Sequence, residues 1–240
     1  MFRLRTFLIG VWVVLLTHTL FAAPHNNAWF RGTLGIPINN KIKVDAELQH
    51  RRQNGFDKCN PLDKNLMLSL RNWVHYQHND NLKFTVSPFA YFYHYRIIQK
   101  QDDENMKPSN EVRFSAAVEL QQPIFRKFYV ANRTTVEYRM FNNGQNITRA
   151  RYRFGGRYEF SRRLKTIGYD EVFLNVSGVS SVHFFDQNRI SISLEYKISS
   201  QWKFDAGYMY LTRSRQSNNS FLYENNILLN LTYELPAGKK

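Results

Sequence analysis

The sequence predicts an all-β fold, a single antiparallel transmembrane β-barrel of about 10–12 strands with short periplasmic turns and longer external loops. Three observations predict it. Apolar and polar side chains alternate over long stretches of the chain. These stretches are longer than the strands of most soluble proteins. The connections between them alternate between short and long, as they do in outer-membrane barrels.

Composition excludes several other classes for this chain of 240 residues. Aromatic residues make up 15% of the chain, which is too many for a disordered protein. The single cysteine, Cys59, excludes a disulfide scaffold. Beyond the extreme N-terminus there is no apolar run of about 18 residues, which excludes a bundle of transmembrane helices.

The N-terminus predicts export of the chain. Arg3 and Arg5 precede the apolar run 6–16, and small residues follow at Ala22 and Ala23. This order of charge, apolar run and small residues is typical of a secretory signal peptide. We therefore expect a signal peptide at 1–23 and a barrel domain at 24–240, with a membrane anchor at the N-terminus as the alternative.

The stretch 149–160 gives the clearest alternation. Its even positions are apolar or small: Ala150, Tyr152, Phe154, Gly156, Tyr158 and Phe160. Its odd positions are charged except for one glycine: Arg149, Arg151, Arg153, Gly155, Arg157 and Glu159. A helix would scatter these arginines around its axis, whereas a strand places them all on one face.

Eleven stretches with this character are candidate strands, and many exceed the roughly 9–11 residues that a tilted strand needs to cross a bilayer. They lie near 28–36, 41–53, 65–78, 82–97, 110–121, 127–141, 147–160, 171–185, 189–198, 201–213 and 221–235. An even number with both ends in the periplasm is expected, so either 28–36 is a partial strand beside ten others, or a further break brings the total to twelve. The connection 161–170 is expected on the periplasmic side although it is long, and 142–146 and 186–188 on the external side although they are short.

The two faces of such strands predict a charged lumen. A sheet can span a membrane only if it is closed, with its apolar face against lipid, so the charged face points inward. The charge ladder that we expect there comprises Arg71, Arg113, Glu119, Arg133, Glu137, Arg139, Arg149, Arg151, Arg153, Arg157, Glu159 and Glu195. Arginine can hold a carboxylate with two hydrogen bonds, so the ladder could fill the lumen as a structural plug. The basic surplus, 33 Lys and Arg against 19 Asp and Glu, favours instead a narrow channel that attracts small anionic solutes.

No catalytic, nucleotide-binding or metal-binding motif is present, so we expect neither an enzyme nor a cofactor. One alternative is a hydrolase that acts on lipid at the barrel rim, with His94, or with His183 close to Ser180 and Ser181. Another is a soluble secreted β-barrel that binds an apolar ligand. Nucleic acid is not an expected partner, because the basic residues share strands with an apolar face. The expected partners are outer-membrane lipid and the barrel-assembly machinery.

Several motifs of the chain resemble a bacterial outer-membrane family called domain of unknown function 2490. The motifs are Trp29, the strand 41–52 that ends in Arg-Arg, Glu111-Val-Arg, Glu137-Tyr-Arg and Arg149-Ala-Arg-Tyr-Arg. The resemblance covers nearly all of the chain after residue 23 and implies a barrel in a Gram-negative outer membrane. It implies no activity, ligand or catalytic residue. The C-terminus departs from many such barrels, because Pro-Ala-Gly-Lys-Lys follows the last strand instead of a terminal aromatic residue.

Overall fold

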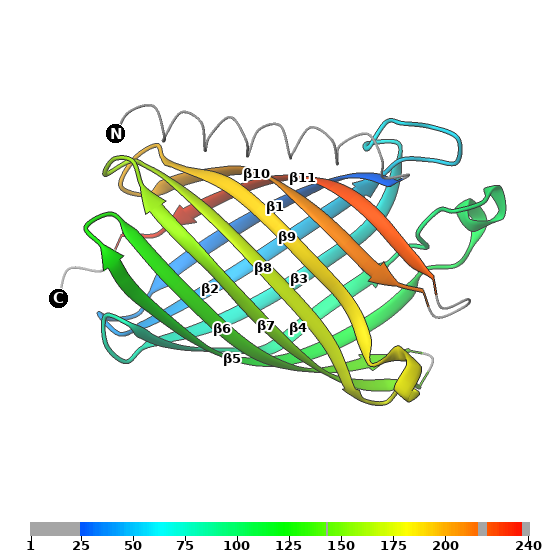
Figure 1. Cartoon of the computed structure of the whole chain (residues 1–240), viewed down its shortest axis with the longest axis horizontal. Helices are drawn as coiled ribbons and strands as arrows, with labels where there is room; N and C mark the ends of the chain where they lie inside the picture. Colours follow the sequence, from blue (N-terminus) through cyan, green and yellow to red (C-terminus); the bar gives the residue numbers. More distant parts are fainter. Residues whose placement is uncertain (1–24, 143, 216–219, 237–240) are drawn as a thin grey trace.

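The computed structural model describes residues 25–142, 144–215 and 220–236. The expected signal peptide at 1–23 lies outside these residues. Strands β1 to β11 form one sheet that closes on itself as a barrel, as predicted (Figure 1). Within the described part of the chain, no helix has the length and apolar character that a membrane crossing needs.

The described residues form eleven long strands, which build the barrel, and two short 3₁₀ helices in its loops, η1 (Gln101–Asn105) and η2 (Ser181–His183). The strands are β1 (His25–Pro37), β2 (Ile42–Gln53), β3 (Lys64–Gln77), β4 (Leu82–His94), β5 (Ser109–Phe125), β6 (Phe128–Phe141), β7 (Asn146–Glu159), β8 (Leu164–Ser177), β9 (Phe185–Lys197), β10 (Trp202–Ser214) and β11 (Phe221–Glu234).

The connections fall into two sets at opposite ends of the barrel. One end carries only tight turns, at 38–41, 78–81, 126–127, 160–163 and 198–201. The other carries the longer connections 54–63, 95–108 with η1, 178–184 with η2, and 215–220, together with the short 142–145. We call these the short-turn end and the long-loop end; the longer connections lie at the right of Figure 1.

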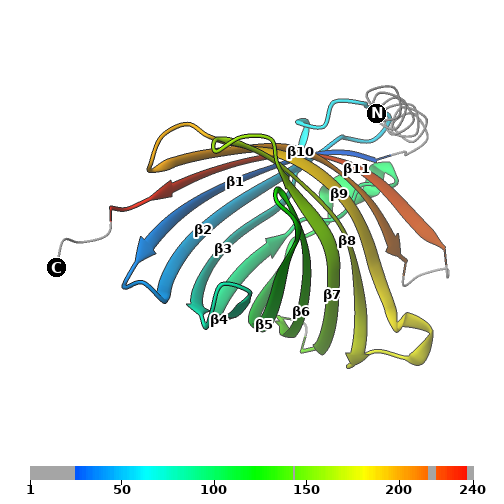
Figure 2. The same ribbon diagram turned by 60° about the vertical axis from the view of Figure 1, so that its left-hand side comes forward.

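The barrel closes between its first and last strands, and this closure corrects the expectation of an even strand count. The segment expected as a partial strand is the complete strand β1, which pairs with β11 in parallel from His25 opposite Glu224 to Gly35 opposite Glu234. All other neighbouring strands are antiparallel. With an odd number of strands, β1 begins at the long-loop end and β11 finishes at the opposite, short-turn end. The two strands run side by side in Figure 2.

The strand expected at 171–185 is displaced, because β8 spans 164–177. The long turn expected at 161–170 is therefore the tight turn 160–163, and the hairpin expected at 186–188 lies within β9. The sequence misleads here because the alternation of β8 is inverted near its start. Ile167 and Tyr169 pair with inward-facing residues, whereas Gly168 and the exposed Asp170 face outward.

The apolar row of β7 faces outward, as predicted, with Tyr152 47% and Phe154 52% exposed. Arg149, on the opposite face of the strand, is only 4% exposed. An outer band of aromatic residues follows the short-turn end. Trp202 packs against Tyr233 there, and Tyr158 against Phe160. The molecule thus presents an apolar outer wall and encloses its charges.

Candidate functional site

The interior of the long-loop half is built around carboxylates that several arginines share. Glu137 on β6 is fully buried. It accepts hydrogen bonds from Arg149 at 2.5 Å, from Arg151 at 2.6 Å and from Arg113 at 3.5 Å. These partners come from the two strands that flank β6, because alternate residues of neighbouring strands face the same side of a sheet.

Two further buried carboxylates extend this arrangement along the wall. Glu111 on β5 accepts from Arg113 at 2.7 Å and from Arg139 at 2.8 Å, and the ring of His94 lies 2.8 Å from its second oxygen. Glu171 on β8 accepts from Arg151 at 2.7 Å and from Arg153 at 3.0 Å. Glu111, Glu137 and Glu171, with the arginines that bond them, form one continuous group, which we call the ionic network.

The residues expected in a ladder occupy different environments. Six lie in the ionic network: Arg113, Glu137, Arg139, Arg149, Arg151 and Arg153. Nearer the short-turn end, Glu119 bonds Lys83 at 2.6 Å and lies 3.7 Å from Arg133. Glu195 bonds Lys165 at 2.9 Å, and Arg157 bonds the more exposed Glu159 at 3.2 Å. Arg71 forms no ion pair with any described carboxylate.

Several interior residues were not expected from the sequence. Glu171 was missed because the position of β8 was wrong, and Asp186, which bonds Arg149 at 2.6 Å, because it was placed in a hairpin. The aromatic residues Trp29, Phe92 and Phe173 are also inside, each 4% exposed or less. Their position on the same strand face as charged residues is the sequence signal that could have identified them.

Three interior arginines lie on aromatic rings and lack a carboxylate partner among the described residues. The Arg51 guanidinium lies 3.4 Å from the centre of the Trp29 ring. That of Arg189 lies 4.3 Å from Phe173 and 5.4 Å from the same Trp29. That of Arg71 lies between Trp73 and Phe92. Ring faces attract cations, but an aromatic side chain carries no net charge, so these three arginines are not neutralised by a contacting carboxylate.

The lumen is narrow, because two contacts cross it. Arg189 on β9 reaches Trp29 on β1, and the guanidinium of Arg133 on β6 lies 5.5 Å from the ring of Trp73 on β3. In each pair the two strands are three positions apart around the barrel. Adjacent strands are about 4.8 Å apart, so these side chains span the interior rather than follow the wall.

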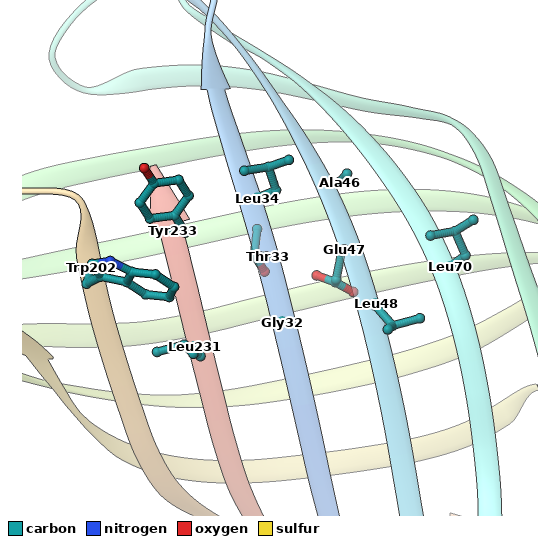
Figure 3. A pocket seen from close by; sticks show the side chains of 10 residues that line it. All are labelled: Gly32, Thr33, Leu34, Ala46, Glu47, Leu48, Leu70, Trp202, Leu231 and Tyr233. Atoms are coloured by element: carbon teal, nitrogen blue, oxygen red, sulfur yellow. The ribbon is translucent and has the colours of Figure 1, made fainter. Parts of the chain in front are cut away.

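A shallow depression marks the outer wall where β11, β1 and β2 meet (Figure 3). The small Gly32 lies between Leu231 and Leu48 of the neighbouring strands, and the small Ala46 lies beside Leu34. Glu47 points away from the viewer in Figure 3 and lies 3.7 Å from Arg31 in an ion pair. Apart from such inward-facing groups the lining is apolar, so we interpret the depression as part of the apolar outer wall.

The hydrolase alternative rests on His94 and His183; a third histidine, His75, lies 3.1 Å from the Thr85 hydroxyl and 3.1 Å from a carboxylate oxygen of Asp45. His94 lies against Glu111, and the hydrogen bonds between described residues join neither His94 nor His183 to a serine hydroxyl through the imidazole ring. The described residues contain no group of three or more His, Cys, Asp or Glu side chains that could hold a metal ion.

The fold and its interior define a class: a closed β-barrel with an apolar exterior and a charged lumen. The NanC porin has this fold, with a TM-score of 0.53 at 10% identity, over 88% of this chain and 99% of the porin. The translocator domain of the autotransporter NalP from Neisseria meningitidis matches with a TM-score of 0.43 at 10% identity, over 78% of this chain and 72% of that domain.

The chain belongs to the family described as "Protein of unknown function (DUF2490)", which it matches over residues 26–221. No curated protein matches the chain. Residues of the family-like motifs converge in the lumen: Trp29 contacts Arg51, and Glu111, Glu137 and Arg149 belong to the ionic network.

Proposed function

We propose that this protein is a bacterial outer-membrane β-barrel that lets small anions pass through a narrow, arginine-rich lumen. The observation that carries the proposal is the presence of Arg51, Arg71 and Arg189 inside the barrel without a carboxylate partner in the described part of the chain. Uncompensated positive charge in a narrow passage raises the local concentration of anions and repels cations.

The outer wall supports the outer-membrane location. A closed sheet satisfies its own backbone hydrogen bonds in lipid, and long strands with exposed apolar rows suit that environment. The porin that shares this fold supports the same location by analogy alone. The partners of this chain would then be membrane lipid and, during assembly, the machinery that inserts barrels into the membrane.

Planar-bilayer recording of the refolded protein tests the proposed channel. Under a gradient of potassium chloride we expect small conductance steps and a reversal potential on the anion-selective side. Replacing Arg51, Arg71 and Arg189 together by glutamine should move the reversal potential toward cation selectivity. Replacing the outward-facing Arg52, which bonds the carbonyl oxygen of Leu62, should leave it unchanged.

A structural barrel is the second candidate, and it rests on the packing of the interior. Glu137, Phe173 and Leu211, on three different strands, are all inaccessible to solvent. If the packed interior were a permanent plug, correctly folded protein would give no conductance in any salt, and that result would overturn the proposed channel.

A further inference from the structure

We propose that Arg51 and Arg189, which converge on Trp29, form a binding site for one small oxyanion, a carboxylate or a phosphate. This site deepens the proposed function, because it assigns a ligand class and a position within the lumen. The two arginines come from β2 and β9, on either side of β1, which carries Trp29. Both guanidinium carbons lie within 5.4 Å of one indole ring.

The two positive charges are not balanced by neighbouring acids. Glu224 and Glu171 are within electrostatic range of Arg51 and Arg189, respectively. Glu224, however, accepts hydrogen bonds from Arg213 and Asn27, both at 2.9 Å. Glu171 is bonded by Arg151 and Arg153. The positive charges of Arg51 and Arg189 repel each other, so a bound anion would relieve the repulsion.

The donors of the site also favour an oxyanion. Arg51 is oriented by Gln49, whose side-chain oxygen accepts from its Nε and Nη2. The buried Nε1 of Trp29 and Nε of Arg189 have no hydrogen-bond acceptor among the described residues. A buried donor without an acceptor costs about 1–3 kcal/mol. Carboxylate and phosphate oxygens accept from guanidinium groups in pairs, which a single halide ion cannot do.

The surroundings limit the size of the ligand. Trp29 packs with the buried Met209 and Leu211 of β10, so one side of the site is closed by apolar side chains. Arg51 and Arg189 are only half-buried, so they are open to the remaining lumen. A compact anion of the size of acetate or inorganic phosphate fits this space better than an extended polymer.

Tryptophan fluorescence of the full-length protein folded in detergent tests the site. Sodium acetate and sodium phosphate are titrated separately against sodium chloride at constant ionic strength. We expect a saturable change in emission with at least one of the two oxyanions, and its loss in Trp29→Phe. Acetate alone would identify a carboxylate site and phosphate alone a phosphate site.

Variants separate the site from general electrostatics. Arg51→Gln and Arg189→Gln should each weaken binding about tenfold or more, as expected for loss of a charge-assisted hydrogen bond. Arg157→Gln is the matched control, because Arg157 also lies on a ring, 4.2 Å from Tyr129, but outside the site. It should bind as the unchanged protein does. Migration on gels before and after heating verifies that every variant is folded.

The outcomes distinguish this site from the proposed channel. Two results would overturn the site, even if bilayer recordings still showed anion preference. One is the absence of a saturable fluorescence change in folded protein. The other is that Arg51→Gln and Arg189→Gln bind the oxyanion as tightly as the unchanged protein does. Saturable binding that needs both arginines, in a protein that does not conduct, would support the site and overturn the channel.

Discussion

Glu137 is the residue on which most of the interior charge depends. It is fully buried and bonds three arginines from β5 and β7. Burying a charge is costly, and the cost is offset only when its partners are well placed. Loss of this one carboxylate would leave the positive charges of Arg113, Arg149 and Arg151 close together with less negative charge beside them.

We therefore predict that Glu137→Gln destabilises the barrel by about 3–5 kcal/mol, the range expected when one partner of a buried ion pair is removed. Urea-induced unfolding in detergent or lipid vesicles measures the effect. Glu159→Gln is the control: Glu159 has a side-chain exposure of 38% and pairs with Arg157 alone, so it should cost at most about 1 kcal/mol. Equal effects of the two substitutions would contradict the central role of Glu137.

At this scale the sequence identified which face carries charge for strands such as β5, β6 and β7, but not which charges meet. Arg113 and Glu111 are two residues apart on one strand, and their contact is local. The contact between Arg189 and Trp29 instead depends on the curvature of the closed sheet and on the strand number. Period-two alternation contains neither quantity, so the unpaired arginines could not be recognised from the sequence.

Among the elements, β7 and β8 approach each other closely where two glycines meet. A Cβ added to Gly155 would lie 2.3 Å from the carbonyl oxygen of Gly168 and 2.6 Å from the Cβ of Tyr169. The absence of a side chain at Gly155 thus permits this spacing. The facing segment of β8 is the one whose alternation is inverted, with Tyr169 inward and Asp170 outward, and this inversion explains why the sequence placed that strand too late.

Gly155→Ala should accordingly destabilise the barrel by about 1–3 kcal/mol, since backbone atoms must shift to admit the methyl group. Gly32→Ala is a matched control in another strand, because an added Cβ at Gly32 meets no atom within 4 Å. It should change stability by about 0.5 kcal/mol or less. Urea midpoints of the two variants compare them directly; a greater loss for Gly32→Ala would refute the steric argument.

The two largest loops at the long-loop end are joined through Glu104 of η1. Its carboxylate bonds Lys64 at 2.8 Å and the backbone N–H of Phe56 at 3.0 Å. The hydrogen bond from Lys64, followed by that from Phe56, lowers the pKa of Glu104. A lowered pKa in the folded protein means that the ionised form favours the joined loops.

This contact should stabilise the loops above the usual pKa of a glutamate and weaken as the pH falls through the lower, folded value. We expect loops 54–63 and 95–108 to exchange amide hydrogens faster, relative to the strands, at pH 3.5 than at pH 7, after correction for intrinsic exchange. Glu104→Gln should show the faster exchange already at pH 7. Exchange that is independent of pH in the unchanged protein would contradict this role.

The barrel is closed by one parallel pair of strands, β1 and β11, and that closure sets the width of the lumen. Outward-facing side chains also cross this seam. Asn225 on β11 accepts from the Tyr208 hydroxyl at 2.6 Å and donates to Asn26 on β1 at 3.2 Å. Sequence reasoning predicted the barrel and its faces but favoured an even strand number, because the pairing of the two chain ends is a long-range property without a local signal.

Engineered disulfides test the closure. In a Cys59→Ser background, cysteines at Phe30 and Leu229, which face each other across β1 and β11, should cross-link on mild oxidation. Their Cα atoms are expected at about 5 Å, within the range that a disulfide spans. The antiparallel pair Phe30 and His50 is the positive control, and Phe30 with Tyr223 is out of register and should not react.

Cross-linking of the positive control without that of Phe30 and Leu229 would show that β1 does not close the barrel. The lumen would then be bounded by ten strands, and the convergence of Arg51 and Arg189 on Trp29 would no longer hold.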